Sequence, residues 1–382
     1  MTPNNLKVAI FQTPIIMGGR LRVVIGIAEI LNDLGVVPDI ITSQLRFNPQ
    51  DVAENYGKQI RAHYRLIPRI PRLSHEFAIV AFNLMIRRYA SHYDLLINTN
   101  NSMIFLPSRP DVLTYMFYPR KSRIMANAAD IHQPDKKIPI GSLAHIRKTL
   151  LKQLYRFSTT KPNQHTICMT KFTCESFKHV YHTPAHLPVI YPPVDIHRFA
   201  SSSPNKQRAV VTLGRFSPGK RQLEQIQLAE CMPDTLFYII GFANNNLYYQ
   251  QCKNYVEMHK IKNVHLYPDA PFSEILNLLQ NSRYFLHTLI NEPFGITAVQ
   301  AIAAGCLPIV HDSGGQRETV PDERLRYRHL NEVPDILKTL ENFSTKERQG
   351  LAQKLRTHVA ENFDASVFKE KMKSELVALL GI

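Results

Sequence analysis

Short apolar runs alternate with longer amphipathic segments through the first half of the chain. The short runs, which predict buried strands, are LKVAIF (6–11), PDIIT (38–42), YDLLINTN (93–100), DVLTYMFY (111–118), HTICMT (165–170) and LPVIYPP (187–193). Apolar positions recur with helical spacing in the segments 20–34, 73–91 and 143–157. This alternation predicts an α/β domain with a parallel sheet, whose binding sites lie beyond the carboxyl ends of its strands.

The pattern restarts after residues 191–209, where Pro, Ser and charged residues show no apolar periodicity and predict a linker. The strands predicted beyond the linker are AVVTLGRF (209–216), TLFYIIGF (235–242), VHLYP (264–268), YFLHTLI (284–290) and LPIVH (307–311), and the segments 333–342, 346–361 and 365–380 predict helices. The chain is therefore predicted to hold two Rossmann-like domains, residues 1–195 and 205–364, facing each other across a cleft.

Positive charge is concentrated in the first half of the chain. The net charge is +15, and residues 1–200 hold 25 Lys+Arg against 12 Asp+Glu, whereas residues 201–382 hold 21 against 19. Such asymmetry indicates that the first domain faces an acidic partner, for which a phosphorylated substrate, an anionic membrane surface and nucleic acid are the candidates. A surface that only keeps the protein soluble is the alternative.

The predicted helix 143–157 combines this charge with apolar residues. Its apolar stripe consists of Leu143, Ile146, Leu150, Leu154 and Phe157, and residues 119–161 carry 10 Lys+Arg against 2 acids. The simplest interpretation is a helix that packs this stripe on the sheet. A basic helix lying on an anionic membrane has the same pattern.

No apolar run reaches the roughly 20 residues that span a bilayer, and the amino-terminal residues predict a strand rather than a signal peptide. The sequence therefore predicts a cytoplasmic protein. Its five cysteines lack the spacing of a disulfide framework or a zinc site, so we expect buried free thiols.

The segment NEPFGITAVQ (291–300) follows a predicted buried strand and opens a predicted helix. Free N–H groups at that helix start would bind an anion such as a diphosphate, and Gly295 would let it approach closely. Glu292 and Gln300 would then lie on the order of 10 Å apart, which suits the two ends of one extended ligand. The alternative is a helix-capping Glu with a surface Gln.

Two cations, Arg215 and Lys220, follow another predicted strand and would stabilise negative charge on the same diphosphate. An ordinary solvated surface is the alternative for both. The sequence has no Asp-x-Asp pair, so no metal is predicted for that role. Gly18 and Gly19, between the first strand and the first helix, indicate either a ligand contact or a simple turn.

Together these motifs resemble a known family. EPFGITAVQAIAAGCLPIVHDSGG (292–315) is similar to the signature of retaining glycosyltransferases of family 4 with the GT-B fold, in which a Glu, seven residues and a second Glu bind the nucleotide sugar. LGRFSPGKRQ resembles the family's diphosphate-binding segment, VIYPPVDIHRF its hinge, ICMTKFTCESF the strand and helix before the hinge, and MGGR its first glycine-rich loop.

The resemblance implies a role for each domain. Residues 1–195, joined by helix 365–382 crossing back, would bind the acceptor, and residues 205–364 would bind the donor. The implied catalytic residues are Glu292, Arg215 and Lys220. The implied donor-binding residues are Gly18, Gly19, Arg215, Lys220, Glu292, Phe294, Gly295, Ile296, Thr297 and Gln300.

Two positions depart from the family pattern. Gln300 replaces the second Glu, so it brings hydrogen bonds without charge. In TYMFYP, which resembles a motif of dolichol-linked mannosyltransferases, Phe117 stands where those proteins carry His. Phe117, Tyr118 and Arg120 are the acceptor-binding residues that this motif implies.

The sequence thus predicts a retaining hexosyltransferase that uses a GDP- or UDP-sugar, without a cofactor or a metal. The expected acceptor is a glycan or a lipid-linked molecule, with peripheral contact to an anionic membrane and no nucleic acid partner. Two alternatives stay open: a non-catalytic GT-B protein that binds a nucleotide sugar or acts as a scaffold, and a GT-B epimerase or phosphorylase.

Overall fold

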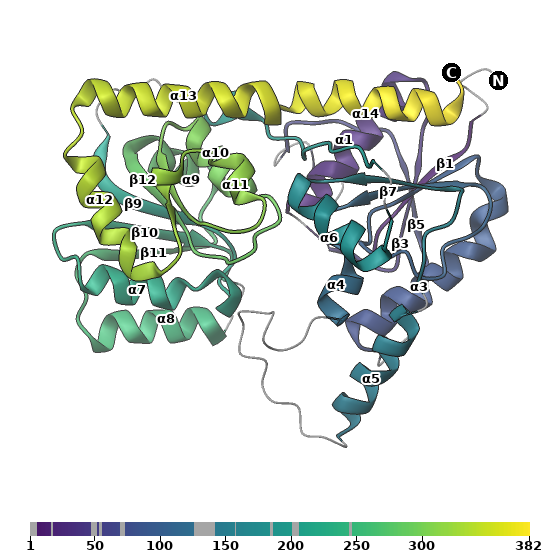
Figure 1. Cartoon of the computed structure of the whole chain (residues 1–382), viewed down its shortest axis with the longest axis horizontal. Coiled ribbons are helices and arrows are strands. Elements are labelled where there is room, and N and C mark those ends of the chain that lie inside the picture. The colour runs from purple at the N-terminus through teal and green to yellow at the C-terminus, as the bar shows by residue number, and fades with distance from the viewer. Residues whose placement is uncertain are drawn as a thin grey trace. The chain divides into compact units, whose positions relative to one another are not determined.

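The structure is a computed structural model. It describes residues 6–16, 18–46, 52, 56–68, 73–125, 142–156, 158–183, 186–200, 206–243 and 247–382. The chain forms two compact units (Figure 1). Unit 1 comprises Met1–Pro193 with Ala365–Ile382, and unit 2 comprises Val194–Asp364.

Unit 1 is built on a parallel sheet of six strands in the order β5-β3-β1-β6-β7-β8. The strands are β1 (Val8–Phe11), β3 (Asp39–Thr42), β5 (His63–Leu66), β6 (Leu95–Asn98), β7 (Asp111–Met116) and β8 (Gln164–Cys168), and β2 (Ile15–Ile16) pairs with β4 (Leu45–Arg46) in a second small sheet. The helices are α1 (Gly19–Asp33), α3 (His75–Tyr89), η2 (Ala90–His92), α4 (Arg120–Met125), α5 (Leu143–Arg156) and α6 (Lys171–Tyr181). β1, β3 and β6 are buried along their whole length, which explains their unbroken apolar character.

The carboxyl-terminal helix α14 (Ala365–Leu380) packs on α1 of unit 1, as Figure 1 shows. Gly26 of α1 permits this contact, because a Cβ there would lie 2.9 Å from the ring of Phe368. Phe368 is consequently buried. The predicted return of the last helix to the first domain is confirmed.

Unit 2 repeats the architecture with the strand order β11-β10-β9-β12-β13-β14, all parallel. Its strands are β9 (Gln207–Leu213), β10 (Leu236–Gly241), β11 (Val264–Pro268), β12 (Ser282–His287), β13 (Leu307–His311) and β14 (Arg326–Tyr327). Its helices are η3 (Ile196–Arg198), η4 (Pro218–Lys220), α7 (Gln222–Glu230), α8 (Leu247–Met258), α9 (Phe272–Asn281), α10 (Ile296–Ala303), α11 (Gln316–Thr319), η5 (Glu323–Leu325), η6 (Leu330–Glu332), α12 (Val333–Glu341) and α13 (Thr345–Phe363). The predicted α/β fold with two Rossmann-like sheets is confirmed.

Each sheet has a topological switch point, where consecutive connections leave in opposite directions along the sheet. In unit 1 it lies between β1 and β6, and in unit 2 between β9 and β12. The loops that leave the carboxyl ends of such neighbouring strands diverge and leave a crevice, which is where open α/β sheets bind ligands. The strand order therefore selects four loops, two in each unit, as candidate binding segments.

Lys206, just before β9, links α9, β12 and the end of α10 within unit 2. Its ammonium group donates hydrogen bonds to the carbonyl oxygens of Leu279, Gln280, Ser282 and Ala304. These groups include the end of α9, the start of β12 and the residue after α10. A cation at two helix carboxyl ends satisfies carbonyls that the helices leave unpaired.

Three sequence predictions differ from the structure. The segment LPVIYPP makes a single bridge from Val189 to Cys168 rather than a strand, because its prolines lack the N–H groups that a ladder needs. Cys231 is exposed, although the other four cysteines are buried free thiols as expected. On one further point the sequence and the structure do not differ: none of the helices in the described ranges is both long and apolar enough to cross a bilayer.

The third difference concerns α5. Ile146 and Leu150 of the predicted core-facing stripe are 56% and 50% exposed. Leu151 and Tyr155 are buried instead, against residues of α3 and of the loop after β6. Tyr155 fixes this orientation through a 2.9 Å hydrogen bond between its hydroxyl and Ser102. The side chains of Leu143 and Phe157 lie outside the described part of the structure.

Candidate functional site at the switch point of unit 2

Lys220, Glu292 and His287 meet at the switch point of the second sheet. Lys220 ends η4, which follows β9, whereas His287 ends β12 and Glu292 lies in the loop beyond it. The Lys220 ammonium is 2.7 Å from Oε2 of Glu292 and 3.4 Å from Nε2 of His287. The structure thus brings together Lys220 and Glu292, which the sequence singled out, and adds His287, which sequence reasoning missed.

The electrostatics of this cluster favour a charged pair beside a neutral imidazole. Burial opposes ionisation of Glu292, but the Lys220 ammonium holds the pKa of that carboxyl below its ordinary value. Burial, followed by the charge of Lys220, lowers the pKa of His287 to about 3. At neutral pH the site therefore holds a carboxylate, an ammonium group and an uncharged histidine.

Gln316, the first residue of α11, completes the cluster from the neighbouring loop. Its side chain lies 2.7 Å from Nδ1 of His287, and it is fully buried. This contact fixes the imidazole ring and leaves Nε2 directed at Lys220 and Glu292. Neither His287 nor Gln316 belongs to a motif that the sequence analysis recognised. Their segments come together only because β12 pairs with β13.

Glycines shape the loop that carries Glu292. Gly314 has φ +68°, and a Cβ there would lie 2.4 Å from the backbone oxygen of Glu292. The N–H of Gly315 donates to the same oxygen at 2.9 Å. Gly295 has φ +89° where the chain enters α10. Gly295 of EPFG and Gly314 of DSGG are therefore required by backbone conformation and, at Gly314, by close approach.

The amino terminus of α10 opens beside this loop. The first turn contains no acidic residue, and Ile296 and Thr297 are half-buried. The first N–H groups of a helix lack intrahelical partners and carry partial positive charge. Phe294 contributes its backbone N–H to the site, where it donates to the Glu292 carboxylate. Its ring does not face the site, since it packs edge-on against Phe363 in the core.

Gln300 lies farther along α10 and is 6% exposed. Within the described ranges its side-chain amide has no hydrogen-bond partner in the protein. The amide atoms are not among the buried polar atoms of the described segments that lack a partner, so they stay accessible to solvent and can bond a ligand. Its position thus suits a polar ligand group.

Arg215 adds a second cation at the carboxyl end of β9. Its side chain is exposed, and its guanidinium has no partner among the residues that the structure describes. The side chain of Gln222 donates to the Arg215 carbonyl and so fixes the backbone at this position. The neighbouring Gly214 is packed closely against Gly241, where a Cβ would lie 1.9 Å from the Gly214 oxygen. Arg215 is therefore a cation free to bind a ligand on a rigid strand end.

The corresponding edge of unit 1 combines open backbone, aromatic rings and a cation. Gly18, with φ +140°, precedes Gly19 at the start of α1, and open space surrounds the place of its missing Cβ. The guanidinium of Arg20 lies 5.7 Å from the ring centre of Phe117. Asn101 accepts hydrogen bonds from the backbone N–H groups of Phe117 and Tyr118, which fixes the loop after β7.

Arg120, in contrast, is engaged within the protein. Its guanidinium bonds Glu76 at 2.8 Å and the carbonyl of Asn100 at 2.9 Å, and the residue is 6% exposed. These bonds satisfy the buried guanidinium within the protein, so its burial does not require a bound acceptor substrate. Arg20, which sequence reasoning did not select, is the cation that faces Phe117.

The described residues contain no group of three or more His, Cys, Asp or Glu side chains in position to hold a metal ion. The cations available at the switch point of unit 2 are Arg215 and Lys220.

Comparisons with known proteins match the part of the chain that contains this site. The family described as Glycosyl transferases group 1 matches residues 193–331. The chain is similar to the GDP-Man:Man(3)GlcNAc(2)-PP-Dol alpha-1,2-mannosyltransferase of Homo sapiens, with 29% identity over 147 residues, 34% of this chain and 30% of that protein. The protein of the same name from Yarrowia lipolytica is 23% identical over 235 residues, 54% of this chain and 36% of that protein. The matches thus span about a third of the length of these relatives.

Solved structures match along nearly the whole chain. Anabaena Alr3699/HepE in complex with UDP-glucose has a TM-score of 0.71 and 17% identity, covering 98% of this chain and 100% of that chain. WaaG, a glycosyltransferase involved in lipopolysaccharide biosynthesis, has a TM-score of 0.69 and 14% identity, covering 96% and 99%. These likenesses confirm the predicted GT-B fold.

The charge pair makes a prediction about pH. In the native chain the pKa of Glu292 is lowered from 4.5, so its contribution to stability is present above that pH and is lost as the pH falls through the folded-state pKa. In Lys220→Met, burial dominates and raises this pKa, so the contribution of Glu292 decreases as the pH rises. Thermal unfolding of both proteins between about pH 4 and pH 7 measures the difference.

Two controls isolate the pair. The double variant Lys220→Met with Glu292→Gln should lose this part of the pH dependence, and Lys262→Met, at an exposed position of the same unit, should retain the native profile. A Lys220→Met profile that follows the native one would contradict the assigned coupling.

Proposed function

We propose that this chain, in which residues 193–331 belong to the family of group 1 glycosyl transferases, moves a hexosyl group from a nucleotide-diphosphate sugar to an acceptor. The observation that carries the proposal is the half-buried Lys220–Glu292 pair beside the amino terminus of α10, with Arg215 free nearby. The transfer is proposed to retain the configuration of the sugar, a point that rests on the family resemblance.

Unit 2 is the proposed donor site. The diphosphate would lie over the N–H groups of Gly295, Ile296 and Thr297, where the helix dipole favours an anion. Arg215 and Lys220 supply the positive charge. Glu292 would accept hydrogen bonds from sugar hydroxyls, and the unpartnered amide of Gln300 would bond a ribose diol.

The proposed chemistry needs stabilisation of a leaving group. As the bond between the sugar C1 and the diphosphate oxygen breaks and a new bond to the acceptor oxygen forms, negative charge grows on the nucleoside diphosphate. Arg215, Lys220 and the helix N–H groups would stabilise that charge, so the proposed mechanism requires no metal ion for this role. His287, neutral because of its low pKa, would position Lys220 and Glu292 rather than carry charge.

Unit 1 is the proposed acceptor side. Gly18, Gly19, Phe117 and Tyr118 lie at the carboxyl edge of its sheet, and Arg20 adds a cation there. The mannosyltransferase relatives are named for GDP-Man and for Man(3)GlcNAc(2)-PP-Dol, and Alr3699/HepE was solved with UDP-glucose. We therefore propose a glycan or lipid-linked acceptor and a GDP- or UDP-sugar donor.

Helix α5 supports contact with a membrane. Ile146 and Leu150 are exposed, and the helix carries Arg147, Lys148, Lys152 and Arg156 without any acidic residue. An exposed apolar pair beside cations suits the boundary between anionic headgroups and acyl chains. We propose that α5 holds the protein at the surface of an anionic membrane, on its cytoplasmic side.

A non-catalytic protein that binds nucleotide sugars is the second candidate, and Gln300 and Phe117 favour it, since each replaces a residue that the family pattern carries. A panel of GDP- and UDP-sugars separates the two functions. Release of free nucleotide with sugar on the acceptor supports transfer, whereas binding without release supports the scaffold.

Arg215→Ala is expected to lower turnover by two to three orders of magnitude, because one charge-stabilising donor is worth about 3–4 kcal/mol in the transition state. Lys220→Ala should have an effect of similar size. The assay measures nucleotide release from the preferred donor. Arg208→Ala, at the opposite end of the same strand β9, is the matched control and should keep native turnover. Native turnover in Arg215→Ala and Lys220→Ala, with unfolding unchanged, would exclude this donor site.

Turnover should persist in excess EDTA, because the charge of the leaving group is stabilised by side chains and backbone N–H groups. The assay compares initial rates before and after chelation and after addition of Mg²⁺ or Mn²⁺. Loss of activity on chelation with recovery on metal addition would refute the metal-free mechanism.

Replacing Lys148, Lys152 and Arg156 together by Gln should weaken binding to vesicles that contain anionic lipid and leave donor affinity unchanged. Binding of the native chain should also fall as salt rises, because exposed charges are screened beyond about 8–10 Å at physiological ionic strength. Vesicle co-sedimentation measures both effects. Replacing Lys253, Lys260 and Lys262 of unit 2 by Gln is the control of equal charge. Equal vesicle binding by both triple variants would rule out α5 as the contact surface.

A further inference from the structure

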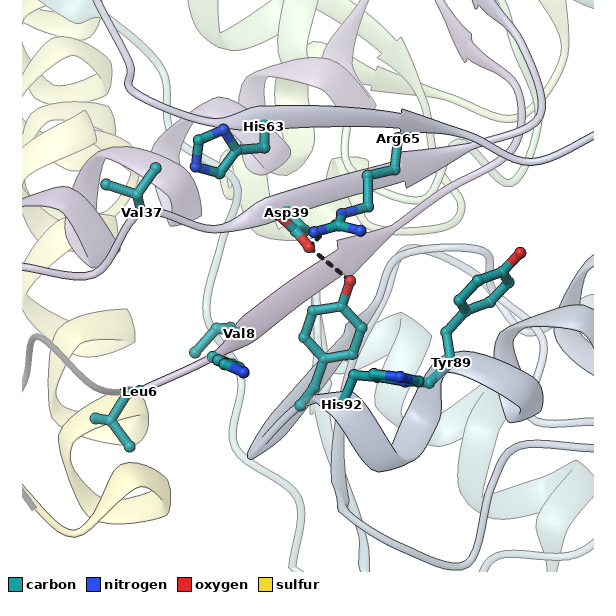
Figure 2. Close-up of a pocket in the computed structure, with 10 residues that line it drawn as sticks. Leu6, Val8, Val37, Asp39, His63, Arg65, Tyr89 and His92 are labelled. Carbon is teal, nitrogen blue, oxygen red and sulfur yellow. Dashed lines mark hydrogen bonds and ion pairs between the residues drawn. The ribbon is translucent and has the colours of Figure 1, made fainter.

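A pocket of about 430 Å³ lies at the opposite edge of the first sheet, where its strands begin (Figure 2). Its walls come from the starts of β1, β3 and β5 and from the turn that joins α3 to β6. β1 separates it from the loop of Gly18, and four residues of strand span about 13 Å. The pocket is therefore distinct from the edge assigned to the acceptor, and the inference below does not depend on the proposed function.

The carboxylate of Asp39, paired with Arg65 and hydrogen-bonded to Tyr93, forms the floor of this pocket. Asp39 is 7% exposed, and its Oδ2 accepts a 2.6 Å hydrogen bond from the hydroxyl of Tyr93. Nε of Arg65 lies 2.5 Å from the same oxygen. Burial, followed by the bond to Asp39, raises the pKa of Tyr93, so the phenol stays a donor. The carboxylate is thus satisfied from two sides.

The rim of the pocket holds hydrogen-bond donors that no protein group uses. Lys7 and His63 are exposed, and within the described ranges their side chains have no partner. Arg65 engages Asp39 through Nε, and its side chain is 61% exposed. Asp94 lies near Lys7 but accepts the backbone N–H of that residue. The Lys7 ammonium group and the remaining N–H groups of Arg65 suit an anion with several oxygens, such as a phosphate.

The other wall is aromatic and apolar. Figure 2 shows Tyr89 and His92 on the helical turn, across Asp39 from His63 and Arg65 on the strand. Tyr89 is 42% exposed, so its ring is accessible, and Val37 adds a partly exposed apolar side chain. A flat ring packs well on such a surface. The pocket therefore offers both an anion site and a ring site.

We propose that this pocket binds a phosphorylated small molecule that contains a ring. The phosphate contacts Lys7, His63 and the free guanidinium nitrogens of Arg65, and the ring packs against Tyr89. The volume falls within the range of about 300–1,000 Å³ that small-molecule sites occupy. Such a ligand would occupy a second site on the first domain, at the edge of the sheet away from Phe117.

Phenyl phosphate is the probe, titrated into the full chain by calorimetry. The variant Lys7→Gln with His63→Gln should bind it about tenfold more weakly, since it loses charge-assisted hydrogen bonds. The matched control, Arg88→Gln with His179→Gln, removes one basic residue and one histidine from other exposed positions of unit 1 and should bind as the native chain does. Arg215→Ala should also bind normally, which distinguishes this pocket from the diphosphate site of unit 2.

Tyr89→Ala tests the ring contact separately. It should weaken binding of phenyl phosphate and leave the weaker binding of inorganic phosphate unchanged. The exposure of Lys7, His63 and Tyr89 lets all these variants fold, and thermal unfolding checks that they do. Equal affinity of the Lys7/His63 variant and its control overturns the proposal. So does binding of inorganic phosphate as tight as that of phenyl phosphate, which indicates an adventitious ion only.

Discussion

The ion pair between Lys220 and Glu292 forms where the strand order of the second sheet reverses, and the surrounding loops are arranged around it. Two half-buried charges are costly unless they are paired, and removal of one leaves the other uncompensated. Because Lys220 follows β9 and Glu292 follows β12, the pair forms only when these strands lie side by side. Gly314 then determines the path of the Glu292 backbone, so sheet topology, loop conformation and charge placement depend on one another.

The two sheets share a topology but differ in what they place at the switch point. Unit 2 presents a carboxylate, two cations and a helix amino terminus, a combination suited to a ligand with negative charge and hydroxyl groups. Unit 1 presents open backbone at Gly18 and the Arg20–Phe117 contact. A common scaffold thus supports two surfaces of different chemistry, because function depends on the loops rather than on the sheet.

Sequence patterns predicted what depends on local order and missed what depends on long-range packing. Buried parallel strands are apolar on both faces, so VAIF and LLIN were recognisable. Glu292 was found because it closely follows such a strand, and Lys220 was found through the family resemblance of its segment, with its place after a strand as support. His287 and Gln316 lie 29 positions apart, and nothing local marks them as partners. The predicted orientation of α5 was wrong by about one residue, since Leu151 is buried and Leu150 is exposed. The hydrogen bond between Tyr155 and Ser102 turns the helix away from the orientation that its apolar stripe predicts.

Cys231, which directly follows α7, is the one exposed thiol among five cysteines that all lie in described segments. Burial raises the pKa of Cys306 to about 11 and that of Cys252 to about 12, which disfavours the reactive thiolate at those positions. A maleimide dye would therefore label unit 2 at a single place. α7 begins two residues after Lys220 and is roughly 14 Å long, so the dye would be attached one short helix away from the Lys220–Glu292 pair. The native chain thus carries its own attachment point for a fluorescent reporter of ligand binding.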